Sequence, residues 1–285
     1  MNATLLLIFK TALFLVGFII IISLLQFFIN IHPPRFYDKD IPSNYGLDYE
    51  KISFKTSDDI QIKGWFITSK ESNGTVIVGH GYPFDKGNIL PVVKFLYPEY
   101  NVLLYDHRYF GESSGWITTA GMNEVKDVEA AVAFVKEKYE DKPIALYGFS
   151  LSAASMLMVD VEVNAIVSDS SYADLENMVR HIYKIFGPLK YPFVKMTNIY
   201  ARIFFGVHPR EISPALAIKN KNIPILVIHG EKDSQIPVEN VHLLKESNPS
   251  IELWIVESAN HGQAYALYKE EYKKRVKDFL RKNMG

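Results

Sequence analysis

Beyond a proline-rich junction at Pro33, Pro34 and Pro42, the chain alternates short apolar runs with stretches of helical periodicity. The runs are rich in Val, Ile and Leu without strict alternation, as expected for strands that are covered on both faces. Six runs predict buried strands, at residues 75–79, 102–105, 144–147, 165–167, 225–228 and 253–256. The clearest helix is predicted at residues 122–139, where apolar residues recur every three or four positions. Strands that alternate with helices indicate a mostly parallel sheet with right-handed crossovers.

Two other segments complete this pattern. Residues 52–56 and 60–68 flank a turn-like Ser-Asp-Asp sequence and predict an antiparallel hairpin ahead of the parallel strands. Between Asp174 and Pro224 there is no strand signal, and the chain is helix-like in pieces with predicted breaks at Gly187-Pro188, Pro192 and Pro209. A connection of that length is rarely a plain loop, so we expect a helical cap insertion over the sheet, at about residues 174–222.

The first 35 residues differ from the rest of the chain. Residues 11–31 carry no charged side chain and would span roughly 30 Å as a helix, enough to cross a bilayer core. The alternatives are a cleaved signal peptide and a buried core helix, but the run is longer than a signal-peptide core and has few polar interruptions. We therefore predict a single-pass membrane anchor over residues 1–35 and one domain over residues 36–285. The flanking Lys and Arg are nearly balanced, and we place the domain outside the cytoplasm.

Composition narrows the classes of function. The formal net charge of −1 gives no overall basic balance for binding nucleic acid. The absence of cysteine excludes disulfides, thiolate nucleophiles and cysteine-ligated zinc. No His and carboxylate cluster suggests another metal site, and no glycine-rich phosphate loop supports kinase or dehydrogenase chemistry. We therefore expect no cofactor, and the sequence leaves the oligomeric state open.

The segment Gly148-Phe-Ser-Leu-Ser152 carries the main chemical signal. It follows a predicted strand and precedes a helix, which would place Ser150 at the apex of a tight strand-to-helix turn. The residues two before and two after the apex must be small because strand and helix nearly touch there. Gly148 meets this condition, and Ser152 meets it approximately. Taken alone, the pattern is weak, because serines that follow strands are common helix caps.

Two other residues, which lie much later in the sequence, strengthen this interpretation. A serine hydroxyl becomes a nucleophile when an imidazole takes its proton and a carboxylate orients that imidazole. Asp233 and His261 each follow a predicted strand, at the carboxyl edge where open α/β sheets gather their sites. Asp169 also follows a strand and is the alternative acid. The amides of Leu151 and Tyr82 are the candidate donors for an oxyanion hole.

Other polar residues at strand ends have structural explanations. His80 and His229 each precede a glycine and are expected to bond the backbone rather than to act in catalysis. Asp106 and Arg108 are expected to brace the loop after their strand. Two further histidines, His181 and His208, lie in the predicted insertion and are expected at the surface.

Several motifs together resemble the α/β-hydrolase superfamily, and within it the serine-aminopeptidase-like and monoglyceride-lipase-like group, which includes members with an N-terminal anchor. The motifs are Val76-I-V-G-H-Gly81, Asp106-H-R-Y-F-G-E-S-S-Gly115, Gly148-F-S-L-Ser152, His229-G-E-K-D-S-Q-Ile236-Pro237 and Asn260-His261-Gly262. The resemblance covers about residues 45–283. It implies an α/β-hydrolase fold, a triad of Ser150, Asp233 and His261, and oxyanion amides at Tyr82 and Leu151. Ser152 stands where the family usually has glycine, and we interpret it as a tolerated variant.

The function predicted from these residues is a membrane-anchored serine hydrolase that cleaves acyl esters or thioesters, of small molecules or lipids, through an acyl-enzyme on Ser150 (EC 3.1). A serine aminopeptidase is one alternative, although such an enzyme usually needs a carboxylate in the cap and residues 177–210 contain none. A binding protein that kept the fold and lost turnover is the other alternative.

The predicted insertion has an unusual charge pattern. Residues 177–210 carry basic side chains interleaved with aromatic ones and no acidic residue. The plain interpretation is that the aromatics line an apolar pocket while the cations are solvated. The alternative is that this surface rests against anionic headgroups beside the anchor.

Overall fold

The computed structural model describes residues 2–139 and 142–284, which form two compact units. One unit joins residues 2–33 with residues 174–212, and the other contains residues 34–173 and 213–284. The division predicted from the sequence, an anchor at 1–35 and a domain at 36–285, stays a prediction. We call residues 174–212 the inserted segment.

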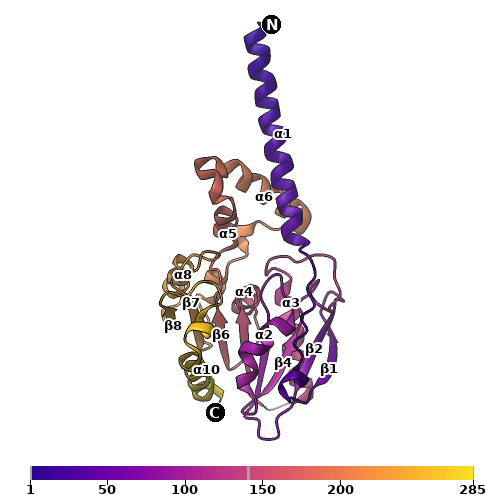
Figure 1. Cartoon of the computed structure of the whole chain (residues 1–285), viewed down its shortest axis with the longest axis vertical. Coiled ribbons are helices and arrows are strands. Elements are labelled where there is room, and N and C mark those ends of the chain that lie inside the picture. The colour runs from indigo at the N-terminus through magenta and orange to yellow at the C-terminus, as the bar shows by residue number, and fades with distance from the viewer. Residues whose placement is uncertain (1, 140–141, 285) are drawn as a thin grey trace. The chain divides into compact units, whose positions relative to one another are not determined.

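The larger unit is built on an eight-stranded sheet in the order β1-β2-β4-β3-β5-β6-β7-β8 (Figure 1). The first three strands in this order pair antiparallel, and all later pairs are parallel. The mostly parallel sheet and the hairpin expected from the sequence are thus confirmed. The strands are β1 (Glu50–Lys55), β2 (Gln61–Ile67), β3 (Thr75–Gly79), β4 (Asn101–Tyr105), β5 (Ile144–Phe149), β6 (Ala165–Asp169), β7 (Ile225–Gly230) and β8 (Glu252–Val256).

Both faces of this sheet are covered, which explains the apolar runs. In β3, Ile77 packs into the core on one face while Val76 and Val78 pack on the other, because successive side chains point to opposite faces. The Ile77 face is covered by α3 (Glu124–Lys138), α4 (Leu151–Met158), α7 (Pro214–Ile218) and α8 (Glu239–Ser247). The opposite face is covered by α2 (Lys86–Val93), α9 (Ala264–Leu267) and α10 (Lys269–Met284). The short 3-10 helices of this unit are η1 (Pro42–Tyr45) and η2 (Lys94–Leu96).

The smaller unit consists of the N-terminal helix and the inserted segment. Helix α1 (Ala3–Ile31) is long and apolar enough to cross a membrane, with a mean hydropathy of 2.8 over its most apolar window. The inserted segment forms α5 (Leu175–Ile182), η3 (Tyr183–Leu189), α6 (Lys190–Phe205) and η4 (Pro209–Glu211). Helices α1 and α6 lie side by side (Figure 1), and their aromatic rings are in contact.

The predicted breaks of the inserted segment are partly wrong. Gly187 does interrupt η3, with φ of 52° and ψ of −130°. Pro192 does not break a helix, since it lies in the first turn of α6, where backbone N–H groups have no intrahelical acceptor and proline is tolerated.

Candidate active site

Ser150 occupies the turn between β5 and α4. Its backbone has φ of 52° and ψ of −106°, a conformation that L-residues rarely adopt. Strand and helix meet closely here, because a Cβ added to Gly148 would lie 2.5 Å from the nitrogen of Ala153. The Ser150 amide donates to the carbonyl oxygen of Asp169 over 2.8 Å, which ties the turn to the neighbouring strand β6. The chain therefore holds the serine side chain at the apex of a strained turn.

His261 and Asp233 lie within hydrogen-bond distance of this serine in a chain of three groups. His261 Nε2 is 3.1 Å from Ser150 Oγ, and His261 Nδ1 is 2.7 Å from Asp233 Oδ2. Asp233 follows β7, and His261 follows β8. The structure thus brings together the three side chains that the sequence predicted, at distances that permit proton transfer.

The loop after β7 fixes the carboxylate of Asp233. Its Oδ1 accepts hydrogen bonds from the amides of Gln235 and Ile236, at 2.9 and 2.8 Å. Burial acts to raise the pKa of Asp233, but the hydrogen bond and charge of His261, together with the Ile236 amide, outweigh it and lower the pKa. The carboxylate is therefore ionised at neutral pH and oriented toward the imidazole.

The loop after β3 passes beside Ser150. A Cβ added to Gly81 would lie 2.7 Å from the ring of Phe149 and 3.2 Å from the Cβ of Ser150, so only glycine fits this approach. Tyr82, the next residue, supplies one candidate oxyanion amide. Leu151 begins α4, and its N–H has no acceptor within the helix. The assignment of these two amides to an oxyanion hole stays a prediction.

Asp169, the alternative acid, has other partners. Its carboxylate accepts hydrogen bonds from the hydroxyl groups of Ser170, at 2.8 Å, and Tyr272, at 2.7 Å. It is buried, and burial raises its pKa. Since Nδ1 of His261 bonds Asp233, the geometry favours Asp233 as the acid of the triad.

The remaining polar residues at strand ends have structural contacts. His80 Nδ1 lies 2.9 Å from the carbonyl oxygen of Gly81, and His229 Nε2 lies 2.8 Å from that of Ile236. Asp106 forms a buried ion pair of 2.6 Å with Lys86. Arg108 pairs with Asp58 and Asp127. These contacts agree with the bracing roles expected from the sequence.

Ser152 forms contacts that the sequence did not indicate. Its hydroxyl donates to the carbonyl oxygen of His80 over 2.5 Å and lies 2.6 Å from Nε2 of His107. His107 Nδ1 in turn lies 3.1 Å from Asp127 Oδ2. A second hydrogen-bonded series of Ser, His and Asp therefore lies close to the first, but all three of its side chains are fully buried. Sequence reasoning missed His107 and Asp127. The serine at the usual glycine position was the signal that a partner lay opposite.

The series of Ser152, His107 and Asp127 has a structural role. It connects α4, through Ser152, to the end of β3 at His80, two residues before Tyr82. Burial, and next the charge of His107, lower the pKa of His80 to about 3, so this ring is neutral at physiological pH. The earlier interpretation of Ser152 as a merely tolerated variant omitted these bonds, and the hydroxyl is part of a buried polar network.

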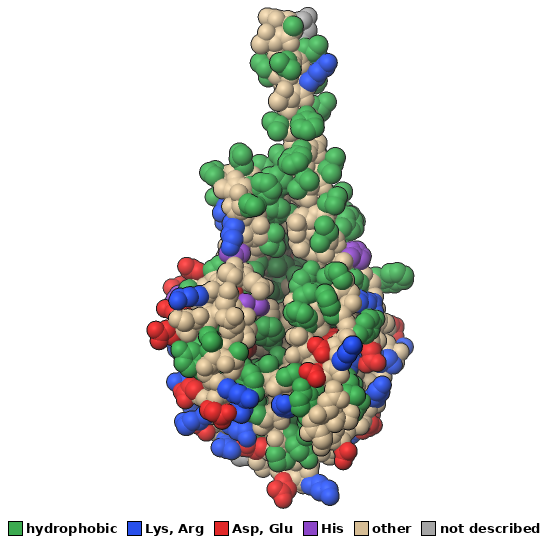
Figure 2. Space-filling view, viewed as in Figure 1, with side chains coloured by type: hydrophobic (Ala, Val, Ile, Leu, Met, Phe, Trp, Pro, Cys, Tyr) green, Lys and Arg blue, Asp and Glu red, His purple; other side chains and the backbone are tan. Residues whose placement is uncertain are grey.

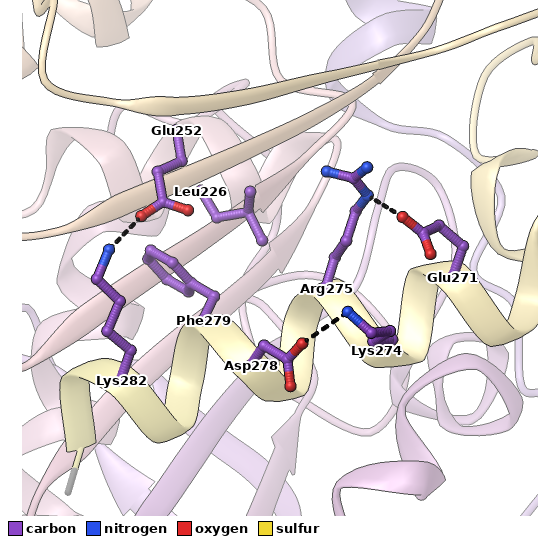
Figure 3. A pocket seen from close by; sticks show the side chains of 8 residues that line it. All are labelled: Leu226, Glu252, Glu271, Lys274, Arg275, Asp278, Phe279 and Lys282. Carbon is purple, nitrogen blue, oxygen red and sulfur yellow. Dashed lines mark hydrogen bonds and ion pairs between the residues drawn. The ribbon is translucent and has the colours of Figure 1, made fainter.

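Away from Ser150, the larger unit has a groove that is lined by charged side chains. This surface groove, between β8 and α10 (Figure 3), is lined largely by charged side chains that pair with one another, such as Lys282 with Glu252 and Arg275 with Glu271. This pairing leaves the groove without convergent free groups. Within residues 2–139 and 142–284, no three His, Asp or Glu side chains are grouped so that they could hold a metal ion.

Comparison with known proteins gives consistent matches. A family model for the alpha/beta hydrolase fold matches residues 74–185. The esterase Pf2001 from Pyrococcus furiosus is 31% identical, with a TM-score of 0.75 over 90% of this chain and 100% of that one. The uncharacterized protein YqkD of Bacillus subtilis is 28% identical over 84% of this chain and 77% of its own. The uncharacterized membrane protein YNL320W of Saccharomyces cerevisiae is 23% identical over 85% and 82%. These matches confirm the fold class expected from the sequence.

Proposed function

Because the chain belongs to the α/β-hydrolase superfamily, we propose that it is a serine hydrolase that cleaves carboxylic esters or thioesters through an acyl-enzyme on Ser150. The observation that carries this proposal is the hydrogen-bonded series from Ser150 through His261 to Asp233, at 3.1 and 2.7 Å. The similarity to an esterase supports hydrolase chemistry, and the geometry supports serine as the nucleophile.

The proposed reaction uses each group in turn. His261 Nε2 accepts the proton of Ser150 Oγ as the oxygen attacks the acyl carbon, and the charged imidazolium is stabilised by Asp233. The amides of Tyr82 and Leu151 donate to the oxyanion of the tetrahedral intermediate. The imidazolium then gives its proton to the leaving alcohol or thiol, which leaves an ester on Ser150. A water molecule, deprotonated by His261, attacks this ester. The bond between the acyl carbon and Ser150 Oγ then breaks, His261 returns the proton to Ser150 Oγ, and the acid is released.

The enzyme is proposed to be held at a membrane by α1. The helix is 29 residues long, and its most apolar window has a mean hydropathy of 2.8. None of the residues in its most apolar window is buried inside the protein. At 1.5 Å per residue the helix rises roughly 44 Å, which exceeds the hydrocarbon core of a bilayer. A single-pass anchor places the enzyme beside lipid acyl chains, which favours lipid-derived or other acyl esters as substrates.

The proposal is tested by hydrolysis of a series of p-nitrophenyl esters of increasing chain length, together with an acyl thioester and an aminoacyl anilide. We expect turnover of esters and no turnover of the anilide. Ser150→Ala should abolish turnover, while Ser155→Ala, a change in the same buried helix, should keep it. Cleavage of the anilide in preference to every ester would instead indicate a peptidase. Binding of substrates without turnover would indicate a fold that has lost catalysis.

A further inference from the structure

The inserted segment packs against α1 through aromatic contacts and hydrogen bonds. The ring of Phe27 stacks against Phe204 at 5.7 Å between centroids and also contacts Tyr200. The hydroxyl of Tyr200 donates to the carbonyl oxygen of Ile20 over 3.0 Å and lies 3.3 Å from the hydroxyl of Ser23. The hydroxyl of Tyr200, which α6 presents to α1, is thus satisfied, as a helix contact within a bilayer requires.

These contacts begin too early along α1 for the inserted segment to stay outside the membrane. Ile19 of α1 already packs against the cluster of Val179, Tyr183 and Phe193. The part of α1 before it, residues 3–18, rises roughly 24 Å, whereas the hydrocarbon core is about 30 Å thick. If α1 spans that core, at least roughly 6 Å of the inserted segment lies at hydrocarbon depth, and more if the helix tilts or if Lys10 remains at the headgroups.

The surface of the inserted segment suits this depth. Ile185 is 85% exposed, Leu189 is 72% exposed and Ile203 is 69% exposed. Figure 2 shows hydrophobic side chains over much of the surface of α1 and the inserted segment, whereas charged side chains are spread over the larger unit. Phe204 is half exposed while it stacks on Phe27, so the apolar surface continues from α1 onto α6. Patches of this kind mark sites of interaction with membranes or proteins.

A basic groove lies beside this apolar surface. It is formed by α5, α6 and His208, has a volume of about 340 Å³, and includes Arg180, Lys195 and Arg202. Arg180 pairs with Glu176 at 2.8 Å. Glu176 is the single acidic residue among those that line the groove. Lys195 and Arg202 lie on one face of α6, two turns apart, with Ile199 between them. This arrangement of cations next to exposed apolar side chains is typical of helices that lie in a membrane interface.

We propose that the inserted segment is itself a membrane-embedded element, with Ile185, Leu189 and Ile203 in the acyl region and the groove at Lys195 and Arg202 occupied by anionic lipid headgroups. The proposal rests on the proposed anchoring by α1. The bilayer is the occupant because the surface is continuous with a helix of membrane-spanning length and carries the charge that anionic lipids attract. Two elements, α1 and the inserted segment, would then hold the enzyme at the membrane.

The experiment uses the full chain, because removal of α1 would strip the inserted segment of its packing partner. The sequence has no cysteine, so Ile185→Cys and Leu189→Cys can each carry one environment-sensitive fluorophore. The labelled proteins are reconstituted in nanodiscs that contain nitroxide-labelled lipids. Leu15→Cys on α1 is the lipid-exposed reference, and Glu162→Cys, on a side chain that is 99% exposed, is the water-exposed reference. We expect blue-shifted emission and lipid quenching at positions 185 and 189 that are comparable to position 15 and several-fold greater than at position 162.

A second experiment tests whether anionic headgroups bind in the groove. A fluorophore is attached at Ile199→Cys, and its quenching by nitroxide-labelled phosphatidylglycerol is compared with its quenching by nitroxide-labelled phosphatidylcholine. Phosphatidylglycerol should quench more strongly. The preference should disappear in Lys195→Gln/Arg202→Gln and at high salt, but persist in Lys136→Gln/Lys274→Gln, which removes the same charge from the larger unit. Equal quenching by both lipids in the unmodified groove would overturn the headgroup assignment.

Three results would contradict the embedding. First, labels at 185 and 189 that are as water-exposed as position 162, while position 15 is in lipid, would contradict the embedding of the inserted segment. The anchoring by α1 would be unaffected by that result. Water exposure at position 15 would remove the proposed anchor together with the inference. Labels that are shielded without lipid quenching, with cross-links between copies, would show that the surface binds a second copy of the chain.

Discussion

The hydroxyl of Ser152 is expected to stabilise the fold although it has no part in the reaction. In Ser152→Ala, the carbonyl oxygen of His80 and Nε2 of His107 both lose a hydrogen-bond partner inside the protein. Each buried polar atom left unsatisfied costs about 1–3 kcal/mol. Tyr105, whose hydroxyl lies 3.4 Å from His107 Nε2, can replace part of the loss. We therefore expect a decrease of roughly 2–4 kcal/mol in the free energy of unfolding.

This decrease is measured by thermal unfolding of the full chain in mild detergent. A loss of that size should lower the midpoint by roughly 3–7 °C in a chain of this length. Ser152→Gly should lose at least as much, because it also adds backbone freedom at the start of α4. Ser155→Ala is the matched control. That hydroxyl is equally buried but bonds only the carbonyl oxygen of Leu151, at 2.9 Å, a backbone group within the same helix.

If Ser152→Ala unfolds within about 1 °C of the unmodified chain, or no earlier than Ser155→Ala, the Ser152 hydroxyl does not stabilise the fold. Activity gives a second check. Since Ser152 acts on the loop that carries Tyr82 only through His80, kcat at low temperature should fall by less than the factor of about 10² that accompanies loss of an oxyanion donor. A larger loss with an unchanged midpoint would assign the hydroxyl to catalysis.

Three further predictions follow from the site. Ser150→Ala and His261→Ala should each lower kcat for ester hydrolysis by about 10⁴- to 10⁶-fold with an unchanged unfolding midpoint, because triad members act as a unit; substantial activity in a folded Ser150→Ala protein would refute the nucleophile. Asp233→Asn should lower kcat by about 10⁴-fold, more than Asp169→Asn; the reverse order would place the acid on β6. The lowered pKa of His80, about 3, means that below the ordinary value near 6.5 the unfolded chain binds a proton that the folded chain does not. Stability should therefore fall as pH drops from about 6.5 toward 3, by up to about 1.4 kcal/mol per pH unit. Unfolding midpoints at several pH values should show this slope, and His80→Gln should flatten it.

The larger unit follows from the sequence because its strands are buried on both faces. Apolar runs without alternation identify such strands, and the helices between them indicate parallel pairing. Parallel strands bring their carboxyl ends to one edge, so Ser150, Asp233 and His261 could be expected together although they lie far apart in sequence. The family resemblance assigned Asp233 as the acid, whereas strand position alone left Asp169 open, because both residues follow a strand at that same edge; the hydrogen bond of His261 to Asp233 agrees with the resemblance.

What the sequence did not indicate depends on contacts between elements. The partner of Ser152 is His107, on the loop after β4, and its position depends on how closely α4 approaches that loop. The packing of α6 on α1 was equally hidden, because aromatic residues at helical spacing do not specify which surface they meet. Pro192 was misinterpreted because proline breaks a helix interior but is tolerated in the first turn, and the start of α6 was not evident.

Active-site labelling asks whether Ser150 is a nucleophile that His261 activates. The full chain is treated with a fluorophosphonate, which phosphonylates an activated serine, and the adduct is located by mass spectrometry of peptides. We expect one adduct, on Ser150, which is absent in Ser150→Ala, forms much more slowly in His261→Ala and is retained in Ser152→Ala. An adduct on another serine, or ester hydrolysis that continues while Ser150 stays unlabelled, would contradict it.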